Sequence, residues 1–260
     1  MLTYDDVYGA FSSARALASN LIRGFETSSM DFPIPSTRWV PMKITSEIFQ
    51  VGGEGFTSPR DAAIYLAAWE DRAALVDAGC GGQMSRLLKN VRACGVDPER
   101  IETLLLTHCH YDHTGGAAEL RLRLNLTIVA HRLDAEFIEV GDDETSAASW
   151  YGASLTPVTV DRKLDRPRET IHLGSRTIEA LHMPGHSPGS LVYLVESEGL
   201  RVLFGQDVHG PLDRRLRSNR ADYRRSLEQM AALEADILCE GHFGVFRGRD
   251  EVRRFILSFL

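Results

Sequence analysis

Residues Thr107–Gly116 read THCHYDHTGG, and this stretch decides how the rest of the chain is interpreted. Within six consecutive positions it holds four side chains that bind metals well, namely His108, His110, Asp112 and His113. An HxHxDH pattern arises by chance on the order of once in a thousand chains of this size and composition. Because imidazole and carboxylate groups bind zinc, iron or manganese, the stretch predicts a metal site, and two adjacent donor pairs favour two ions.

The motif lies between an apolar strand, predicted at Thr103–Leu106, and a helix, predicted at Ala117–Leu124. Alternate side chains of an extended segment share a face, so the first two histidines are expected to point the same way. The turn that follows carries the aspartate and the third histidine into a neighbouring volume. By the same alternation Cys109 points away from the donors, as a small buried side chain.

Three further segments each place one donor at the end of a predicted strand. His186 lies in the Gly- and Pro-dense turn MPGHSPGS, Asp207 ends the apolar run LFGQD, and His242 ends CEGH. An earlier aspartate, Asp77, follows a strand in the turn VDAG. Because functional side chains gather on the loops that a scaffold positions, we expect His186, Asp207 and His242 to converge with the motif on one sheet edge.

The chain has 260 residues, of which 43% are hydrophobic and 25% charged, typical of one large globular domain. Its net charge of −7 gives no indication of a nucleic-acid or anionic-membrane partner. The cysteines are scattered without a CxxC pair, and neither a signal peptide nor an apolar run of about 20 residues is visible. We therefore expect a soluble cytoplasmic protein that acts on a small molecule, with no nucleic-acid and no membrane partner.

Residues 1–40 are expected to form an appended helix and linker, and residues 41–260 the main domain. Apolar residues spaced at steps of three and four define one helical face: Val7, Phe11, Ala14, Ala18, Leu21 and Phe25. The segment Phe32–Pro35, FPIP, ends that helix. The sequence leaves open whether the helix packs on its own domain or supports a homo-oligomer.

The remaining pattern predicts short strands that alternate with helices. Strands are expected at Ile44–Val51, Ala63–Trp69, Ala73–Val76, Thr103–Leu106, Leu126–Ala130, Val158–Val160, Arg176–Leu181, Leu191–Val195, Arg201–Phe204 and Asp236–Cys239. Helices are expected at Gln83–Ala93, Ala117–Leu124, Arg132–Val140, Tyr223–Leu233 and Asp250–Phe259. Hairpin-like strand runs mixed with helices favour sheets packed between helical layers over a simple parallel βαβ repeat.

In this order, Asp77, HxHxDH, His186, Asp207 and His242 resemble the signature of the metallo-β-lactamase superfamily, in its glyoxalase II-like and lactonase-like hydrolase branch. The likeness runs from about Ile44 to the C-terminus. It implies an α/β (α+β) fold, a four-layer αββα sandwich with an extra N-terminal helix, in which residues 41–260 form the catalytic domain. It also implies a metal site at one edge of the two sheets.

The resemblance assigns roles to the donors. A first metal would be held by His108, His110 and His186, and a second by Asp112, His113 and His242, with Asp207 bridging both. Asp77 would support the site from the adjoining loop without binding a metal.

The same resemblance implies two divalent ions as cofactors, zinc first, with iron or manganese as alternatives, and a hydroxide that bridges them. That hydroxide would attack a small ester, thioester or lactone, while Asp112 orients it or moves its proton. Two dications less three negative charges leave roughly one positive unit, which suits an anionic tetrahedral intermediate. No serine or cysteine nucleophile is needed.

Four residues near the predicted donors are candidates for substrate binding: His209, Asn219, Arg220 and Phe243. Glyoxalase II enzymes proper carry a helical domain after the last metal histidine, whereas only residues 243–260 follow here, so specificity for glutathione thioesters is not carried over. The segment VHGP after Asp207 lacks the tyrosine of lactonase-like members, which weakens a lactonase assignment. β-Lactamases of the main class carry a cysteine at this aspartate's position, so penicillins are not expected as the main substrate.

Three other functions stay open at this point. A persulfide dioxygenase of the same superfamily would use one iron held by His108 or His110, His186 and Asp207. A phosphodiesterase is a further alternative, although neither a basic arm nor a nucleic-acid module is visible. A binding module that merely keeps the fold is disfavoured by the complete ligand set.

Overall fold

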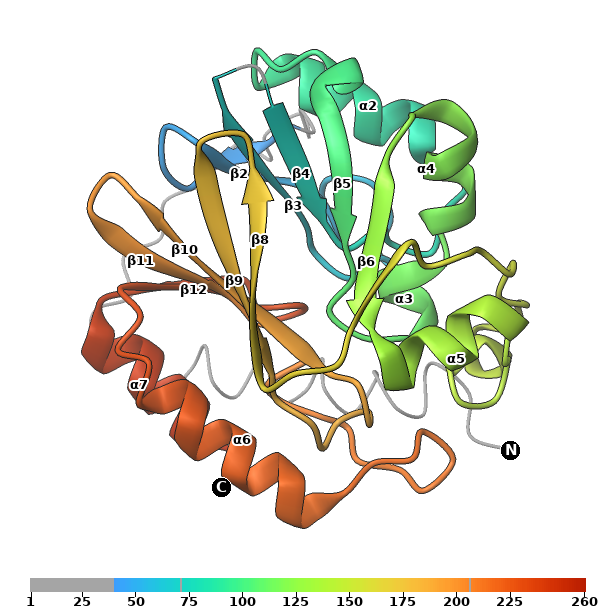
Figure 1. Ribbon diagram of the computed structural model, residues 1–260, viewed down its shortest axis with the longest axis vertical. Coiled ribbons are helices and arrows are strands. Elements are labelled where there is room, and N and C mark those ends of the chain that lie inside the picture. Colours follow the sequence, from blue (N-terminus) through green and yellow to red (C-terminus); the bar gives the residue numbers. More distant parts are fainter. Residues whose placement is uncertain (1–39, 71, 206) are drawn as a thin grey trace, which may run out of the picture.

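The computed structural model describes residues 40–70, 72–205 and 207–260. Apart from Val40, the predicted N-terminal helix and linker lie outside the described residues. Two β-sheets stack face to face with helices on both outer sides, which is the four-layer arrangement expected from the sequence (Figure 1). Among the described residues no helix combines the length and the apolar character needed to cross a membrane.

The first sheet has the strand order β1-β2-β3-β4-β5-β6-β7. Its strands are β1 (Met42–Lys43), β2 (Ile48–Gly52), β3 (Ile64–Trp69), β4 (Arg72–Val76), β5 (Ile101–Leu105), β6 (Thr127–His131) and β7 (Arg162–Leu164). Strands β1 to β4 pair antiparallel, whereas β4 to β7 pair parallel. Parallel neighbours need crossover connections, and the chain uses helices for them. These are α2 (Met84–Ala93), α4 (Ala117–Arg123) and α5 (Arg132–Val140).

The second sheet has the order β13-β12-β11-β10-β9-β8. Its strands are β8 (Arg168–Leu173), β9 (Arg176–His182), β10 (Leu191–Ser197), β11 (Leu200–Phe204), β12 (Ile237–Cys239) and β13 (Val245–Arg247). Only β11 and β12 pair parallel, and they are joined through helix α6 (Arg220–Ala231). Helix α7 (Arg249–Leu257) follows β13, and the short elements are α3 (Tyr111–Thr114), η1 (Pro98–Arg100) and η2 (Ala148–Tyr151).

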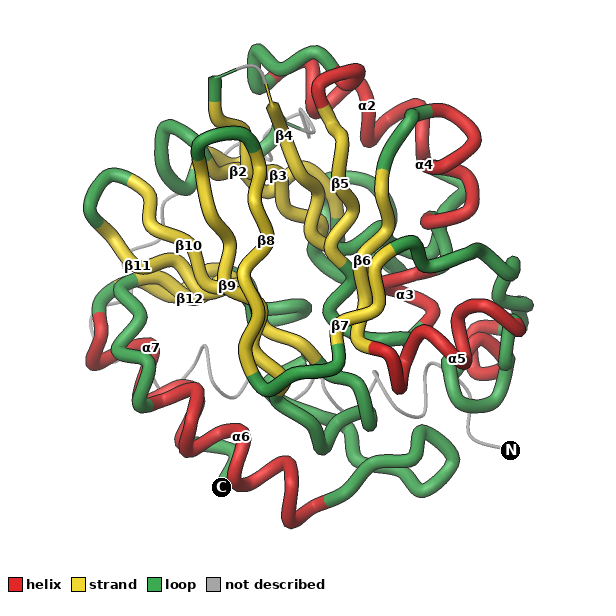
Figure 2. The backbone as a smooth tube through the Cα atoms, in the orientation of Figure 1, coloured by secondary structure: helices red, strands yellow, loops and turns green. Residues whose placement is uncertain are grey.

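The apolar residues form three layers, one between the two sheets and one under the helices on each outer side. Figure 2 shows the strands of the two sheets with the helices outside them. Alternation along buried strands explains this, because successive side chains point to opposite faces. In β3, Leu66 packs under α2 while Tyr65 points between the sheets. In β10, Val192 packs toward α6 and α7 while Tyr193 points between the sheets. Strands buried on both faces therefore read as continuous apolar runs.

One edge of the sandwich collects the loops that matter for function. Strands β4 and β5 run parallel, as do β11 and β12, so the carboxyl ends within each pair lie at the same edge. Backbone hydrogen bonds join the two sheets there: Leu191 N–H donates to Thr107 O at 2.7 Å, and Ala63 N–H donates to Gly241 O at 2.8 Å. This edge is the rigid platform that the sequence predicted for the donors.

The strand predicted at Ile44–Val51 is too long. The N–H groups of Ile44 and Thr45 both donate to the carbonyl of Ile48, which folds this segment back on itself. The Thr45 hydroxyl also accepts from the N–H groups of Glu47 and Ile48. Because such local hydrogen bonds compete with strand pairing, only the second half of the segment joins the sheet, as β2.

The strand predicted at Val158–Val160 is wrong. Both valines are buried in the core under the first sheet's helices, but their backbone does not pair with a neighbouring strand. Pairing with β6 begins two residues later, in β7. The valines are apolar because they pack against the core, and a burial signal in a short run does not distinguish a strand from a buried loop.

Candidate metal centre

All seven predicted metal-binding side chains meet at the edge where the two sheets are joined. Two groups have donor atoms that lie within 4.8 Å of one another. The first group is His108, His110, His186 and Asp207, and the second is Asp112, His113 and His242. These residues come from the ends of β5, β9, β11 and β12, so the fold and not chain proximity brings them together.

Asp207 lies between the histidines of the two groups, and each of its carboxylate oxygens faces one group. Its Oδ2 is 3.4 Å from His186 Nε2 and 4.0 Å from His108 Nε2. Its Oδ1 is 3.1 Å from His113 Nε2 and 3.3 Å from His242 Nε2. A carboxylate that presents one oxygen to each of two donor groups has the geometry of a bridging ligand.

The backbone explains how the motif serves both groups. Strand β5 ends at Leu105, and His110 (φ −68°, ψ 148°) is an extended residue directly before α3. The single helical turn of α3 then redirects the next side chains, so that Asp112 and His113 join the second group. Gly241 keeps the opposite wall close, because a Cβ at this position would collide with the Asp207 carboxylate.

Hydrogen bonds on the far side of the imidazole rings orient three of the histidines. His113 Nδ1 donates to Asp77 Oδ2 at 2.7 Å, and His186 Nδ1 donates to the carbonyl of Pro211 at 2.9 Å. The Thr107 hydroxyl donates to Asp77 Oδ2 and therefore accepts from His108 Nδ1 at 3.0 Å. Since each Nδ1 is held on the far side of its ring, each Nε2 faces the centre and is the nitrogen that can bind a metal once it is unprotonated.

Asp77 supports the motif from the end of β4. Besides His113 and the Thr107 hydroxyl, it accepts the Thr107 N–H on Oδ1 at 2.8 Å. Asp77 has a φ of 63°, in the left-handed region where non-glycine residues are uncommon. A strained backbone conformation held by a hydrogen-bond network is typical of functional sites.

Replacing Asp77 with asparagine should weaken the second donor group. An amide has one acceptor oxygen, so in either orientation its NH₂ group faces a donor that the carboxylate now accepts. We expect metal affinity of this group to fall about 10- to 100-fold and the free energy of unfolding to fall by about 1–3 kcal/mol. Isothermal titration with zinc and thermal unfolding measure the two effects. Exposed Asp165→Asn is the matched control, and unchanged zinc binding in Asp77→Asn would contradict the role assigned to Asp77.

Several buried polar atoms at the centre make no hydrogen bond to any described residue, and their contacts are with one another. Within the part of the chain that the structure describes, Nε2 of four histidines (His108, His110, His113 and His186) makes no hydrogen bond, and neither do Asp112 Oδ2 and Asp207 Oδ1. These residues are all at most 4% exposed. Leaving so many buried polar atoms unpaired costs free energy unless another group satisfies them. Nitrogen and carboxylate donors in this arrangement fit a divalent transition metal such as zinc.

The protonation preferences of the two groups differ. Burial and the neighbouring imidazoles hold the pKa of His108 and that of His110 well below the usual range, so both rings are neutral. Burial also disfavours a charge on His242, but Asp207 and Asp112 outweigh it and raise the pKa of His242 to about 10. Although burial opposes it, the charges on His242 and His113 keep the pKa of Asp207 well below its usual range. Without metal, a proton on the imidazole of His242 therefore offsets part of the negative charge of Asp207 and Asp112.

Access to the centre lies on the side of His242, whose side chain is 18% exposed while the other donors are almost fully covered. His209 lies there, its ligand atom grouped with those of Asp207 and His242. Its ring contacts that of Phe243 at 5.0 Å. His209 and Phe243, two of the predicted substrate residues, thus border the accessible side.

Glu240 is a functional residue that the sequence analysis missed. It is fully buried, and its Oε1 accepts from His209 Nδ1 at 3.0 Å and from Val208 N–H at 3.1 Å. Its Oε2 accepts the N–H groups of His242 and Phe243 at 2.6 and 2.7 Å. Glu240 therefore holds the loop that carries His242. The signal in the sequence is its place two residues before that histidine, directly after the strand predicted at Asp236–Cys239.

The other two predicted substrate residues lie at the start of α6. The Asn219 side-chain oxygen caps that helix by accepting from the N–H groups of Ala221 and Asp222, and its own N–H donates to the carbonyl of Gly185 at 2.8 Å. Arg220 is exposed in the first turn. Asn219 is thus tied to the loop of His186, whereas Arg220 stays a prediction for substrate binding.

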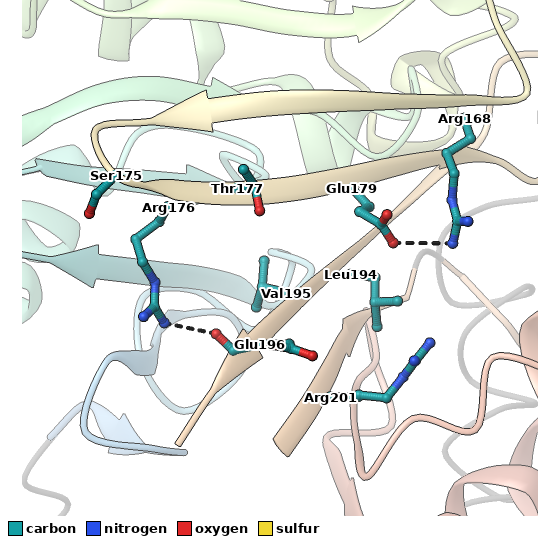
Figure 3. Close-up of a pocket in the computed structure, with 9 residues that line it drawn as sticks. All are labelled: Arg168, Ser175, Arg176, Thr177, Glu179, Leu194, Val195, Glu196 and Arg201. Atoms are coloured by element: carbon teal, nitrogen blue, oxygen red, sulfur yellow. Dashed lines mark hydrogen bonds and ion pairs between the residues drawn. The ribbon is translucent and has the colours of Figure 1, made fainter. Parts of the chain in front are cut away.

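A hollow of about 560 Å³ lies away from this centre, on strands β8 to β11 (Figure 3). Two of its arginines are paired: Arg168 with Glu179 at 3.1 Å, and Arg176 with the backbone carbonyl of Glu196 at 2.8 Å (Figure 3). None of the donors lines this hollow. A third arginine, Arg201, also lines the hollow.

The chain is similar to several known proteins. The family model of the metallo-beta-lactamase superfamily matches residues 57–242. The acyl-coenzyme A thioesterase MBLAC2 of Gallus gallus is 27% identical over 244 residues, which cover 83% of this chain and 84% of that protein. The hydroxyacylglutathione hydrolase GloC of Haemophilus influenzae is 29% identical over 143 residues, covering 54% of this chain and 63% of that protein.

Among solved structures, BJP-1, a subclass B3 metallo-beta-lactamase of Bradyrhizobium japonicum, superposes with a TM-score of 0.72. The match covers 84% of this chain and 90% of that one at 23% sequence identity. At this identity the likeness shows a shared fold and says nothing about substrate.

Proposed function

The chain belongs to the metallo-beta-lactamase superfamily, and we propose that this metal-dependent hydrolase cleaves a small thioester, ester or lactone at a dinuclear site. The observation that carries the proposal is the position of Asp207. Its two oxygens face two separate histidine groups, at 3.4 Å from His186 Nε2 and 3.1 Å from His113 Nε2. A centre for one ion needs only one of these groups, whereas a bridging carboxylate makes use of both.

Two bound divalent ions, zinc in our proposal with iron or manganese as alternatives, would supply an acidified water and polarise the acyl oxygen. The residues of the chain do the rest. Asp112 is buried beside His242 and His113, with its Oδ2 at 3.2 Å and 3.8 Å from their Nε2 atoms. From there it accepts a hydrogen bond from the attacking water and fixes its direction.

The proposed hydrolysis consumes one water molecule and transfers one of its protons to the leaving group. The water oxygen forms a bond to the acyl carbon, the proton passes to Asp112, and the carbon–sulfur or carbon–oxygen bond breaks. The thiolate or alkoxide that leaves takes up the proton, and a carboxylic acid is released. No side-chain nucleophile is needed, and buried Cys109, which lies between two donors, packs in the core under the first sheet's helices.

A thioester is the first substrate class to test. MBLAC2 is named an acyl-coenzyme A thioesterase and is similar over most of both chains, which supports this choice. We propose that the substrate enters on the side of His242, where the imidazole of His209 and the ring of Phe243 contact it. The imidazole offers a hydrogen bond and the phenyl ring an apolar surface, as an acyl compound with a polar reacting end requires.

The test is a substrate panel on protein whose metal content has been measured. We expect hydrolysis of acyl thioesters with about two equivalents of zinc or manganese bound, and slower hydrolysis of oxoesters and lactones. The panel also includes a β-lactam and, with an oxygen electrode, glutathione persulfide. Oxygen consumption with one equivalent of iron, and no hydrolysis of any ester, would replace this proposal with the dioxygenase.

A further inference from the structure

A second buried aspartate, Asp134, holds two loops of the metal centre together without facing the donors. It lies in the first turn of α5 and is completely buried. Its Oδ2 accepts from the N–H of Cys109 at 2.8 Å and from the hydroxyl of Ser187 at 2.6 Å. Its Oδ1 accepts from the N–H of Gly189 at 2.6 Å.

These partners lie next to metal-binding residues. Cys109 stands between His108 and His110, in the loop after β5 of the first sheet. Ser187 follows His186, in the loop between β9 and β10 of the second sheet. One carboxylate therefore links the loops that supply three of the four side chains of the first donor group.

Helix α5 and a neighbouring serine hold Asp134 in place. Helix α5 follows directly on β6, and His131 at its N-cap accepts the N–H of Leu133 through Nδ1. A negative charge in the first turn of a helix is favourable. The Ser187 hydroxyl, which donates to Asp134, accepts in turn from Ser190 at 2.8 Å, so its direction is fixed.

The hydrogen bonds of this arrangement require a carboxylate at Asp134 and a glycine at Gly189. Three donors converge on the side chain, and only an ionised carboxylate accepts all three, because an amide of the same shape turns its NH₂ toward at least one of them. At Gly189 an added Cβ would lie 2.6 Å from Asp134 Oδ1, so no other residue permits this approach.

We propose that Asp134 is a positioning residue, which sets the distance of His108 and His110 from His186 and thereby the metal affinity of the first donor group. The inference rests on the proposed function only in that this group binds a metal ion, and it holds for any substrate. Partners one residue removed from the ligands act through geometry, as groups behind metal ligands commonly do.

The test compares Asp134→Asn and Ser187→Ala with wild type. Cobalt and zinc affinities are measured by competition with a chelator, together with the visible spectrum of the cobalt form and the thermal unfolding of the metal-free protein. Asp134→Asn should lower the affinity for the first ion about 10- to 100-fold and change the cobalt spectrum. Ser187→Ala removes one of the three hydrogen bonds and should give a smaller loss in the same direction.

Asp161→Asn is the matched control, because Asp161 accepts the N–H of Ile128 at the start of β6, far from the donors, at 2.7 Å. We expect its metal affinity to equal that of wild type. A fold support with no positioning role would lower the unfolding temperature of metal-free Asp134→Asn while leaving its metal affinity and cobalt spectrum unchanged, and this result overturns the inference.

If Asp134→Asn does not fold, the test relies on Ser187→Ala. Wild-type metal affinity in Ser187→Ala also overturns the inference. A different outcome is that the wild type binds metal and hydrolyses nothing on the panel, while the two variants show these graded losses of affinity. That result supports the inference and contradicts the proposed function.

Discussion

Replacing His110 with alanine should lower kcat by at least about 1,000-fold, because a group that binds the catalytic ion and stabilises charge in the transition state is lost. The fold should survive. His110 Nε2 makes no hydrogen bond within the described residues, and the hydrogen bonds of this residue run through its backbone carbonyl, which accepts from His113 N–H and Thr114 N–H. Alanine keeps that carbonyl.

The measurement is kcat on the best substrate of the panel, with metal content and circular dichroism on the same samples. His172→Ala is the matched control, since His172 is exposed on β8 and lies outside the donor groups. It should retain wild-type kcat. Wild-type turnover in folded His110→Ala would mean that the donor groups are not the site of the reaction.

The donors were predictable because they are concentrated in local patterns. Six positions contain four of the seven donors, and each of the other three stands at the end of an apolar run. A strand end is visible in a sequence, and the edge at which strand ends gather follows from the fold class. His108 and His110 needed only the two-residue alternation of an extended chain to be placed on one side.

The residues behind the donors were not predictable, because their roles depend on distant partners. Asp134 serves Cys109, 25 positions away, and Gly189, 55 positions away. In the sequence it is one acidic residue in the first turn of a helix, where acidic residues are common for reasons of helix stability. Glu240 looks the same as any residue at a strand end until His209 is placed beside it.

Short edge strands are also hard to predict from the sequence, because they too depend on distant partners. β8 and β13 were not predicted, and both are edge strands whose pairing partners decide their conformation. Strand preference reflects packing on neighbours more than the residue itself. Helix α5, by contrast, was predicted with its observed bounds, Arg132–Val140, because its pattern is local and Gly141 ends it in the left-handed conformation.

Removing the metal ions with a chelator should reduce turnover to background and lower the midpoint of thermal unfolding by about 10 °C. Ions bound at about 1,000 times their dissociation constant stabilise the folded state by about 4 kcal/mol, and each kcal/mol corresponds to roughly 2–4 °C in a chain of this size. The metal-free protein should nevertheless stay folded at neutral pH. Turnover that persists after metal analysis shows less than about 0.1 equivalent would contradict the mechanism.

A proton on His242, in the second donor group, contributes to the stability of the metal-free protein. The pKa of His242 is raised to about 10 by Asp207 and Asp112 against the opposing effect of burial. A raised pKa stabilises the folded state fully below the unfolded value of about 6.5, and this contribution is lost as the pH rises through about 10. The unfolding temperature of the metal-free protein should therefore fall between neutral pH and pH 10.

Ions that rebind at neutral pH must displace this proton, because imidazole binds a metal only when its ring nitrogen is unprotonated. Zinc added to the metal-free protein should thus release at least one proton. Calorimetry in buffers of different ionisation enthalpy measures it, and zinc already saturated with chelator is the control. His242→Ala should reduce the release, since the alanine has no proton to give up. Equal proton release from wild type and this variant would show that zinc does not enter the second group through His242.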